Sequence, residues 1–322
     1  MAELDVLLAT YQGAPHLAAL LKSLEAQTYA DWRLILRDDG STDDSTAIVE
    51  EWAIRSGKSL KVLRDDGAGL GPAASFGRLL VASDAPYFCF CDQDDVWLPE
   101  KLEQLVDAVK KAESVSPERF PVLAHCDLRV IDEKLDEISP SFWAMNYVSD
   151  GSIARVGRPA TVPASLLLQN TVTGCSLLGN AALRRSAIPI PSDVGMHDWW
   201  LALVAAYLGE IKGVASPLVL YRQHGSNVIG ARGWGPLSVL QRGLKGPLGA
   251  LRRAHQSLQA SQAMAIALAN RHEASIRREE FRVLKAYSEL RNRRVLARKL
   301  FLFRYGIRPA AWIILPIFLA VI

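Results

Sequence analysis

Short apolar runs, typical of strands, alternate with stretches of helical periodicity along the first ninety residues. In chain order, the runs and stretches are 5–10, 16–26, 32–37, 44–56, 60–64, 73–82 and 87–91. Such an alternation predicts strand–helix–strand units joined by right-handed crossovers. We therefore expect an α/β protein with a Rossmann-like, mainly parallel sheet flanked by helices.

Polar or glycine-rich residues follow the end of each predicted strand. They are Thr10-Tyr11-Gln12-Gly13, Asp38-Asp39-Gly40-Ser41, Gly69-Leu70-Gly71 and Asp92-Gln93-Asp94-Asp95. The carboxyl ends of parallel strands share one edge of a sheet, and nucleotides bind at that edge in open α/β folds. The pattern indicates a nucleotide site built from these loops.

The Asp92-Gln93-Asp94-Asp95 segment concentrates three carboxylates in four positions. Their mutual repulsion and loss of hydration after a buried strand are costly. A hard cation such as Mg²⁺ or Mn²⁺ would relieve that cost and could share its remaining positions with a diphosphate. The alternative is a solvated acidic turn that opens a helix near Pro99. The short motif by itself does not separate the two.

Composition agrees with a folded enzyme of the cytosol. The chain has 322 residues, of which 50% are hydrophobic, enough for one large core and an extension. The acidic start at Glu3 and Asp5 does not resemble a signal peptide. The four cysteines lack CxxC spacing and are expected to be buried, reduced thiols.

Positive charge is concentrated in the last third of the chain. Residues 252–308 contain 14 Lys or Arg and four Glu, and an apolar stretch of 13 residues, 310–322, follows. A spanning helix needs about 20 residues. We therefore expect a monotopic anchor, in which basic helices meet anionic headgroups and Trp312 lies at the interface. The alternative is a soluble helical subdomain that folds its end into a core or a dimer contact. No nucleic-acid motif accompanies the charge.

Six motifs in order resemble one enzyme family. They are Thr10-Tyr11-Gln12-Gly13, Asp38-Asp39-Gly40-Ser41, Asp92-Gln93-Asp94-Asp95-Val96-Trp97, Thr173-Gly174-Cys175-Ser176, His197-Asp198-Trp199-Trp200 and Arg222-Gln223-His224-Gly225. Residues 4–230 thereby resemble a family 2 glycosyltransferase of the GT-A fold, closest in order and spacing to the rhamnosyltransferase-like branch. The expected organisation is a transferase domain at 1–230 and a basic helical tail at 231–322.

The resemblance assigns the donor side of the site. It implies that Thr10 and Tyr11 wall the nucleoside, that Asp39 accepts a hydrogen bond from a pyrimidine, and that Gly71 lets the backbone approach the nucleotide. The simpler alternatives are a strand end, an Asx-turn supported by Asp38, and a helix start. Asp92 is expected at the ribose or a metal-bound water, and Asp94 is expected to ligate Mg²⁺ or Mn²⁺.

The acceptor side follows from the same resemblance. Asp198 is expected to remove the acceptor proton, with His197 as the fallback base; a helix N-cap is the alternative role for Asp198. Trp199 and Trp200 are expected to contact a sugar, although one of them could belong to the core. Gly174 is expected in the acceptor wall.

The Arg222–His224 segment is expected to close over the diphosphate, with Arg222 or His224 contacting phosphate or metal. A structural histidine is the alternative for His224.

The expected function is inverting, metal-dependent transfer of a sugar, with rhamnose as the first choice, from a dTDP- or UDP-sugar. The expected acceptor is a glycan on a lipid carrier at the inner face of the cell membrane, and a homo-oligomer is left open. The alternatives are a sugar-1-phosphate nucleotidyltransferase and a non-enzymatic membrane scaffold. The segment at 7–13 lacks the Gly-rich loop with Arg and Lys expected of the nucleotidyltransferase.

Overall fold

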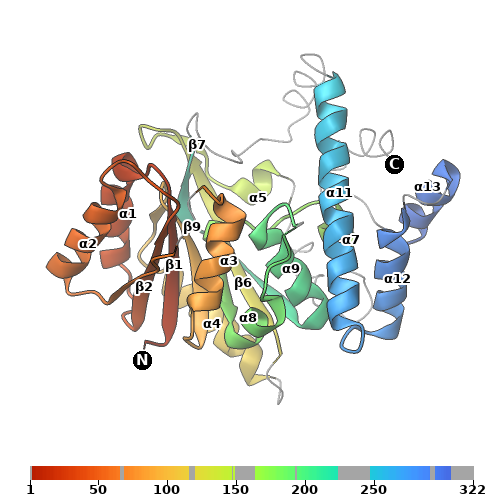
Figure 1. The fold of residues 1–322 in the computed structure, drawn as a ribbon, viewed down its shortest axis with the longest axis horizontal. Coiled ribbons are helices and arrows are strands. Elements are labelled where there is room, and N and C mark those ends of the chain that lie inside the picture. Colours follow the sequence, from red (N-terminus) through yellow and green to blue (C-terminus); the bar gives the residue numbers. More distant parts are fainter. Residues whose placement is uncertain are drawn as a thin grey trace.

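The computed structural model contains one mixed sheet with helices on both faces (Figure 1). It describes residues 2–65, 69–115, 120–146, 148, 164–192, 194–223, 247–290 and 294–305. The strand order is β3-β2-β1-β4-β8-β6-β9-β5, and β7 pairs with β6. The apolar segment 310–322, expected as an anchor, lies outside the described residues.

The first half of the sheet is parallel, as the alternation of runs and helices predicts. Its strands and helices are β1 (Leu4–Thr10), α1 (Ala14–Glu25), β2 (Trp32–Asp38), α2 (Ser45–Ser56), β3 (Leu60–Val62), α3 (Pro72–Ala82) and β4 (Tyr87–Asp92). The register pairs Thr10 with Asp38 and Ala9 with Asp92. The polar ends of β1, β2 and β4 therefore lie side by side at one edge.

The second half departs from a mainly parallel sheet. It contains β5 (Val96–Trp97), β6 (Val122–Ile131), β7 (Glu137–Ser139), β8 (Leu177–Asn180) and β9 (Glu210–Arg222). Strand β8 is antiparallel to both β4 and β6, and β9 is parallel to β6 but antiparallel to β5. The sheet is therefore mixed.

Strands β6 and β9 are longer than their apolar runs suggest. The buried polar residues His125 and Asp127 continue β6 beyond its apolar start, Val122–Ala124, and the β6–β9 register shifts around Asp127. A shift of this kind bends a strand pair and lets it continue past residues that break the regular pattern.

Alternate residues of the strands face two separate cores, as the two-residue period of a strand requires. Leu4, Val6 and Leu8 of β1 pack in the core beneath α1, α2 and α4 (Lys101–Ser114). Leu7 faces the opposite core, which contains residues of α3, α8 (Ala181–Ala187) and α9 (His197–Leu208). Between β7 and β8 the chain also forms the short helices α5 (Phe142–Met145) and α7 (Ala164–Leu168).

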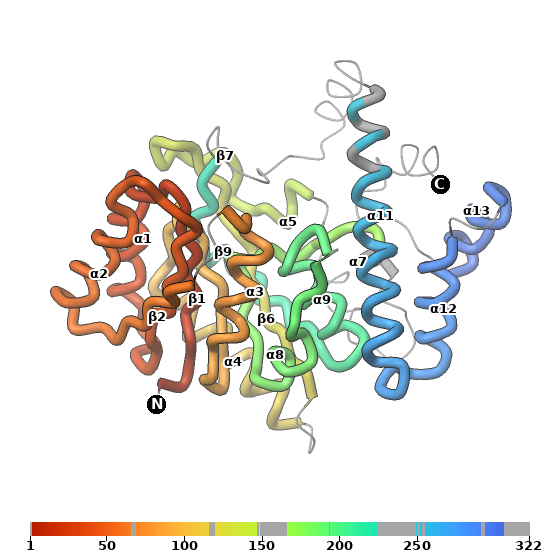
Figure 2. Tube along the Cα trace, in the orientation of Figure 1, coloured from red at the N-terminus to blue at the C-terminus, as the bar shows by residue number. Residues whose placement is uncertain are grey.

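Three C-terminal helices lie at the end of the molecule opposite α1 and α2 (Figures 1 and 2). They are α11 (Pro247–His272), α12 (Arg278–Ser288) and α13 (Val295–Arg304). Met264 and Tyr287 belong to the same core as α9, and the Tyr287 hydroxyl donates to the Leu167 carbonyl at 2.9 Å. Within the described ranges, no helix is both long and apolar enough to cross a bilayer.

Candidate functional site

The loops after β1 and β2 are joined by side-chain hydrogen bonds. The Thr10 hydroxyl donates to Asp38 Oδ1 at 2.8 Å, and Asp38 Oδ2 accepts the backbone N–H groups of Gly40 and Ser41 at 3.1 and 2.7 Å. The role of Asp38 as support for an Asx-turn is thereby confirmed. Thr10 meets this turn at the sheet edge, where a nucleoside wall was expected.

Asp39 holds the loop that leads into α3. Its Oδ1 accepts from the Arg37 guanidinium and the Leu70 N–H, both at 2.9 Å, and its Oδ2 accepts the Gly71 N–H at 2.8 Å. Gly71 has a φ of 79°, which favours glycine. A carboxylate offers about four acceptor positions. Within the described part of the chain three are used, which leaves one for a ligand.

The pKa of Asp39 is lowered. Burial of the carboxyl opposes ionisation, but the hydrogen bonds from Arg37, Leu70 and Gly71 outweigh it. Asp39 is therefore an ionised acceptor at neutral pH, as recognition of a ring N–H requires. Gly71, which was expected to let the backbone approach the nucleotide, donates its own N–H to Asp39.

Gln93 connects the acidic turn to the first loop. Its Oε1 accepts the Tyr11 N–H at 2.8 Å and its Nε2 donates to the Tyr11 carbonyl at 2.9 Å. A Cβ at Gly13 would lie 2.2 Å from the same Oε1, so glycine is required for this close approach. The Tyr11 ring is 56% exposed beside these contacts. Gln93 was not predicted as a site residue, because the three neighbouring carboxylates indicated a metal site instead.

Three potential metal-ligating atoms lie together behind this turn. One side-chain atom each of Asp92, Asp95 and Cys175 lies within 4.8 Å of the others. Asp95 is buried, and its Oδ1 accepts the Arg222 N–H at 3.2 Å. Among the described residues its Oδ2 has no nitrogen or oxygen partner, and the neighbouring Cys175 thiol partly offsets the rise in the pKa of Asp95. Asp94 is half-buried, and its carbonyl accepts from Arg222 Nε at 2.8 Å.

Burial and crowding disfavour ionisation of these acids. Burial raises the pKa of Asp92 to about 7, and the charges of Asp94 and Asp198 add to the shift. The pKa of Asp95 is raised well above its ordinary value, first by burial and then by Asp94 and Asp92. The cluster therefore favours a cation, whether a proton or a metal ion.

Lys101 supplies one positive charge from inside the protein. Its side chain is fully buried, its Nζ donates to the Cys175 carbonyl at 2.7 Å, and it lies 3.0 Å from the Trp97 ring centroid. Its charge lowers the pKa of Asp92 against the effect of burial. The sequence gives no signal for this role, because a lysine at a helix start is normally exposed.

The donor set fits a hard cation. The Asp95 and Asp92 carboxylates are oxygen ligands of the kind that Mg²⁺ and Mn²⁺ prefer. Burial raises the pKa of the Cys175 thiol, so the sulfur stays protonated and is a poor ligand for these ions. Asp94, expected as the direct ligand, is not in this group of three, and His224 lies outside the described residues.

Asp198 lies in the first turn of α9 and is buried. Its Oδ2 accepts the Gly174 N–H at 3.0 Å and its Oδ1 accepts the Trp199 N–H at 2.6 Å. Burial raises its pKa to about 7 in spite of these bonds. Gly174 directly precedes Cys175, whose sulfur lies with side-chain atoms of Asp92 and Asp95, so Asp198 is held near the acidic cluster. Its charge also raises the pKa of Asp92. Met196, not Asp198, is the N-cap of the helix.

His197 does not suit the fallback role of base. Its ring stacks on Phe76 at 4.4 Å and meets Phe90 edge-on at 4.7 Å, as centroid distances. Burial lowers its pKa to about 3, and neither ring nitrogen has a hydrogen-bond partner in the described structure. It is a neutral, weakly basic core residue.

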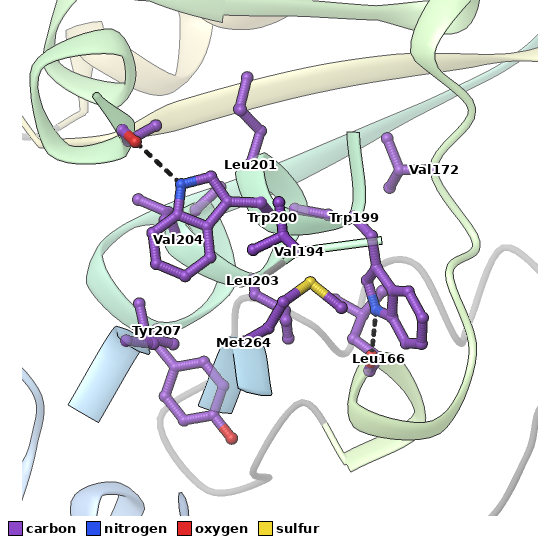
Figure 3. Packing of buried hydrophobic residues seen from close by; sticks show 14 of the residues in the cluster. Leu166, Val172, Val194, Trp199, Trp200, Leu201, Leu203, Val204, Tyr207 and Met264 are labelled. Carbon is purple, nitrogen blue, oxygen red and sulfur yellow. Dashed lines mark hydrogen bonds between the residues drawn. The ribbon is translucent and has the colours of Figure 1, made fainter. Parts of the chain in front are cut away.

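Trp199 and Trp200 are also packed in the core (Figure 3). Their indole N–H groups donate to the carbonyls of Leu166, at 2.6 Å, and Ala187, at 2.9 Å. Both rings are buried, so the role expected as the alternative for one of them, a place in the core, holds for both, and the expected contact with a sugar is corrected. The physical reason is that α9 is apolar on all sides and is therefore enclosed.

Gly174 and Arg222 frame the acidic cluster. A Cβ at Gly174 would lie 3.1 Å from His197 Nε2 and 3.7 Å from Asp198 Oδ2, so a small residue leaves room beside Asp198. Arg222 is buried, ends β9 and binds the backbone of the acidic turn. A contact of Arg222 with phosphate remains a prediction.

Comparison with known proteins supports the resemblance. Residues 5–147 match the model of Glycosyl transferase family 2. The chain is 25% identical over 232 residues to an uncharacterized glycosyltransferase of Nostoc, covering 70% of this chain and 66% of that one. It is 25% identical, also over 232 residues, to dTDP-rhamnosyl transferase RfbG of Shigella flexneri, covering 70% and 74%. A glycosyltransferase of Rickettsia conorii is matched over 31% of its length.

Solved structures show the same fold. The S. aureus TarS 1–349 complex with UDP-GlcNAc aligns with a TM-score of 0.55 at 16% identity, covering 99% of this chain and 90% of that one. The mannosyltransferase PcManGT of Pyrobaculum calidifontis, in complex with GDP-Man and Mn²⁺, aligns with a TM-score of 0.51 at 16% identity, covering 99% and 86%. The expected GT-A fold is thereby confirmed.

Proposed function

We propose that this chain, a glycosyltransferase with its family 2 region at residues 5–147, transfers a sugar from a nucleotide diphosphate to an acceptor hydroxyl with inversion. The observation that carries the proposal is the convergence of Asp198 with the acidic turn. Gly174, which holds Asp198 by a hydrogen bond, directly precedes Cys175, and the Cys175 sulfur lies with side-chain atoms of Asp92 and Asp95, although Asp92 and Asp198 come from different halves of the chain.

Asp198 has the properties required of a general base. A base works best when its pKa is near the working pH, and burial raises the pKa of Asp198 to about 7. Its two backbone hydrogen bonds, from Gly174 and Trp199, fix the carboxylate. Asp198 would take the proton of the acceptor hydroxyl as that oxygen attacks the anomeric carbon and the diphosphate leaves. Direct attack inverts the carbon.

Asp92 and Asp95 would hold Mg²⁺ or Mn²⁺, with Asp94 and His224 as the further candidates named by sequence. The bound ion would take up charge on the departing diphosphate. The Mn²⁺ in the PcManGT complex supports use of a divalent cation on this fold.

The donor proposed first is dTDP-rhamnose, with a UDP-sugar second. Support comes from the name of the Shigella relative, from the UDP-GlcNAc bound to TarS and from the free acceptor position on Asp39. The proposed acceptor is a glycan on a lipid carrier.

A donor panel tests the function. The full chain is incubated with dTDP-rhamnose, UDP-GlcNAc or GDP-mannose, with Mn²⁺ or with EDTA, and nucleoside diphosphate release is measured. We expect Mn²⁺-dependent release from a pyrimidine donor. Release of pyrophosphate from a nucleoside triphosphate and a sugar 1-phosphate would instead identify a nucleotidyltransferase, and release from no donor would contradict the proposal.

A further inference from the structure

Helix α13 carries an exposed apolar stripe on the side that faces away from the protein. Leu296, Leu300 and Phe303 recur at i, i+4 and i+7, so they share one helix face, and their side chains are 71%, 59% and 88% exposed. Phe301 and Leu302, on the other side of the helix, are buried. The helix is thus apolar on both sides, although one side alone faces the protein.

Basic residues flank the exposed stripe. Lys299 and Arg304 are exposed and lie next to it on the helix surface. Long basic side chains in such positions can place their charge at a bilayer surface while their methylene groups lie on apolar chains. An arrangement of this kind is typical of helices that lie in the plane of an interface.

The sequence around α13 indicates which kind of surface binds the exposed stripe. From Leu290 to the C-terminus there is no Asp or Glu, whereas seven Lys or Arg occur between Arg291 and Arg308, and the apolar segment 310–322 follows. A second protein surface would need both an apolar face and a matching acidic patch. An anionic bilayer offers both the negative charge and the apolar layer.

The position of α13 leaves the stripe accessible. The helix is at the end of the molecule opposite α1 and α2, beyond α11 and α12 (Figures 1 and 2). We propose that the Leu296, Leu300 and Phe303 face of α13, with Lys299 and Arg304, docks the protein on an anionic lipid bilayer. This inference goes beyond the proposed sugar transfer and does not depend on it.

Vesicle sedimentation of the full chain tests the docking surface. Vesicles of phosphatidylcholine, alone or with phosphatidylglycerol, are used at about 0.1 M salt, where charge is only partly screened. We expect binding to the mixed vesicles and much weaker binding to phosphatidylcholine alone. Leu300→Asp with Phe303→Asp should reduce binding at least about tenfold, because the apolar face is lost. Lys299→Glu with Arg304→Glu should also reduce it at least about tenfold.

The matched control is Ile54→Asp with Val81→Asp, which changes two exposed apolar residues, 84% and 59% accessible, on α2 and α3. Its binding should stay within about twofold of wild type, since it lies outside the proposed surface. All variants should keep their folded state by circular dichroism and their nucleoside diphosphate release toward a soluble acceptor. Absence of release by the wild type would count against the transferase, not against docking.

Three results would overturn the inference. The first is vesicle binding by the Leu300→Asp and Phe303→Asp variant equal to wild type. The second is wild-type binding that does not depend on phosphatidylglycerol. The third is a wild-type dimer, by light scattering, that this variant converts to monomer without any vesicle binding, which would make a second copy the occupant.

Discussion

The backbone N–H of Gly174 donates a 3.0 Å hydrogen bond to Oδ2 of Asp198, and this contact joins two segments 24 residues apart. It fixes a buried carboxylate beside the acidic turn while leaving the space next to Gly174 without a side chain. The proposed base is therefore held in place before any acceptor arrives, which is the condition for efficient proton transfer.

Asp198→Asn should abolish turnover. An amide cannot accept the acceptor proton, so kcat should fall by about 10²–10⁴. Donor affinity, measured by calorimetry, should change little, because Asp198 is placed on the acceptor side. Asp107→Asn, an exposed acid on α4, is the control and should behave as wild type. Turnover of Asp198→Asn near the wild-type rate would remove the base assignment.

The pH dependence of kcat should show a rising limb near pH 7. Burial raises the pKa of Asp198 to about 7, so the carboxylate is mostly protonated and inactive below that pH and mostly ionised above it. His197→Phe should keep this profile, because His197 packs between Phe76 and Phe90 and is not the base. A limb that disappears in His197→Phe would reverse the two assignments.

Asp95→Asn should stabilise the protein at pH 8 in EDTA. The folded-state pKa of Asp95 is raised above its unfolded value, so the folded state binds more protons between those two pKa values. Stability due to this group is therefore present at low pH and is lost as pH rises through the folded-state pKa.

Removing the ionisable group should recover about 1 kcal/mol or more at pH 8, because the wild-type carboxyl is buried and its pKa is raised. The effect should vanish below the unfolded pKa, near pH 4. Urea unfolding at both pH values measures it. Added Mn²⁺ should stabilise wild type more than Asp95→Asn, and equal stabilisation would exclude Asp95 as a ligand.

Asp39→Ala should weaken donor binding and destabilise the loop before α3. The change removes the acceptor for Arg37, Leu70 and Gly71, so we expect a donor KM about tenfold higher and about 1–3 kcal/mol less stability. Asp44→Ala is the control, because its exposed side chain makes no capping hydrogen bond. A variant with an unchanged KM would place the nucleoside elsewhere.

Gly209 and Gly77 should respond in opposite directions to alanine. A Cβ at Gly209 would lie 1.7 Å from the Pro121 carbonyl oxygen, a backbone atom that cannot easily move, so Gly209→Ala should cost about 2 kcal/mol or more. A Cβ at Gly77, inside α3, meets Ile190 at an ordinary 3.7 Å, so Gly77→Ala should gain about 0.5–1 kcal/mol. Thermal unfolding of both variants checks the contrast.

The sequence predicted the parallel half of the fold well, for a local reason. Strands β1, β2 and β4 are short and predominantly apolar, and short-range periodicity defines the helices between them. The polar edge followed directly, since parallel strands end together. The sequence alone therefore predicted that the same sheet edge carries Asp38, Asp39 and the Asp92–Asp95 turn.

The second half depended on pairings that sequence periodicity does not contain. Asp127 is buried because it accepts hydrogen bonds from the Ser141 hydroxyl and the Trp143 N–H. These partners are 14 and 16 positions away in the sequence, and the contacts extend β6 past its apolar run. Lys101 is buried beneath the acidic cluster for the same kind of reason. Trp199 and Trp200 could have been read as core, because the uniformly apolar composition of α9 was visible in the sequence.

Separate regions of the chain contribute the proposed donor and acceptor sides of the site. This separation affects how substrate specificity could change during evolution. Asp39, Gly71 and the acidic turn belong to the first 95 residues, whereas Gly174 and Asp198 follow more than 75 residues later. Relatives could therefore exchange the later region by recombination and acquire a new acceptor while keeping the same activated sugar. Chimeras joined between β7 and α7 would be the natural way to retrace such a history.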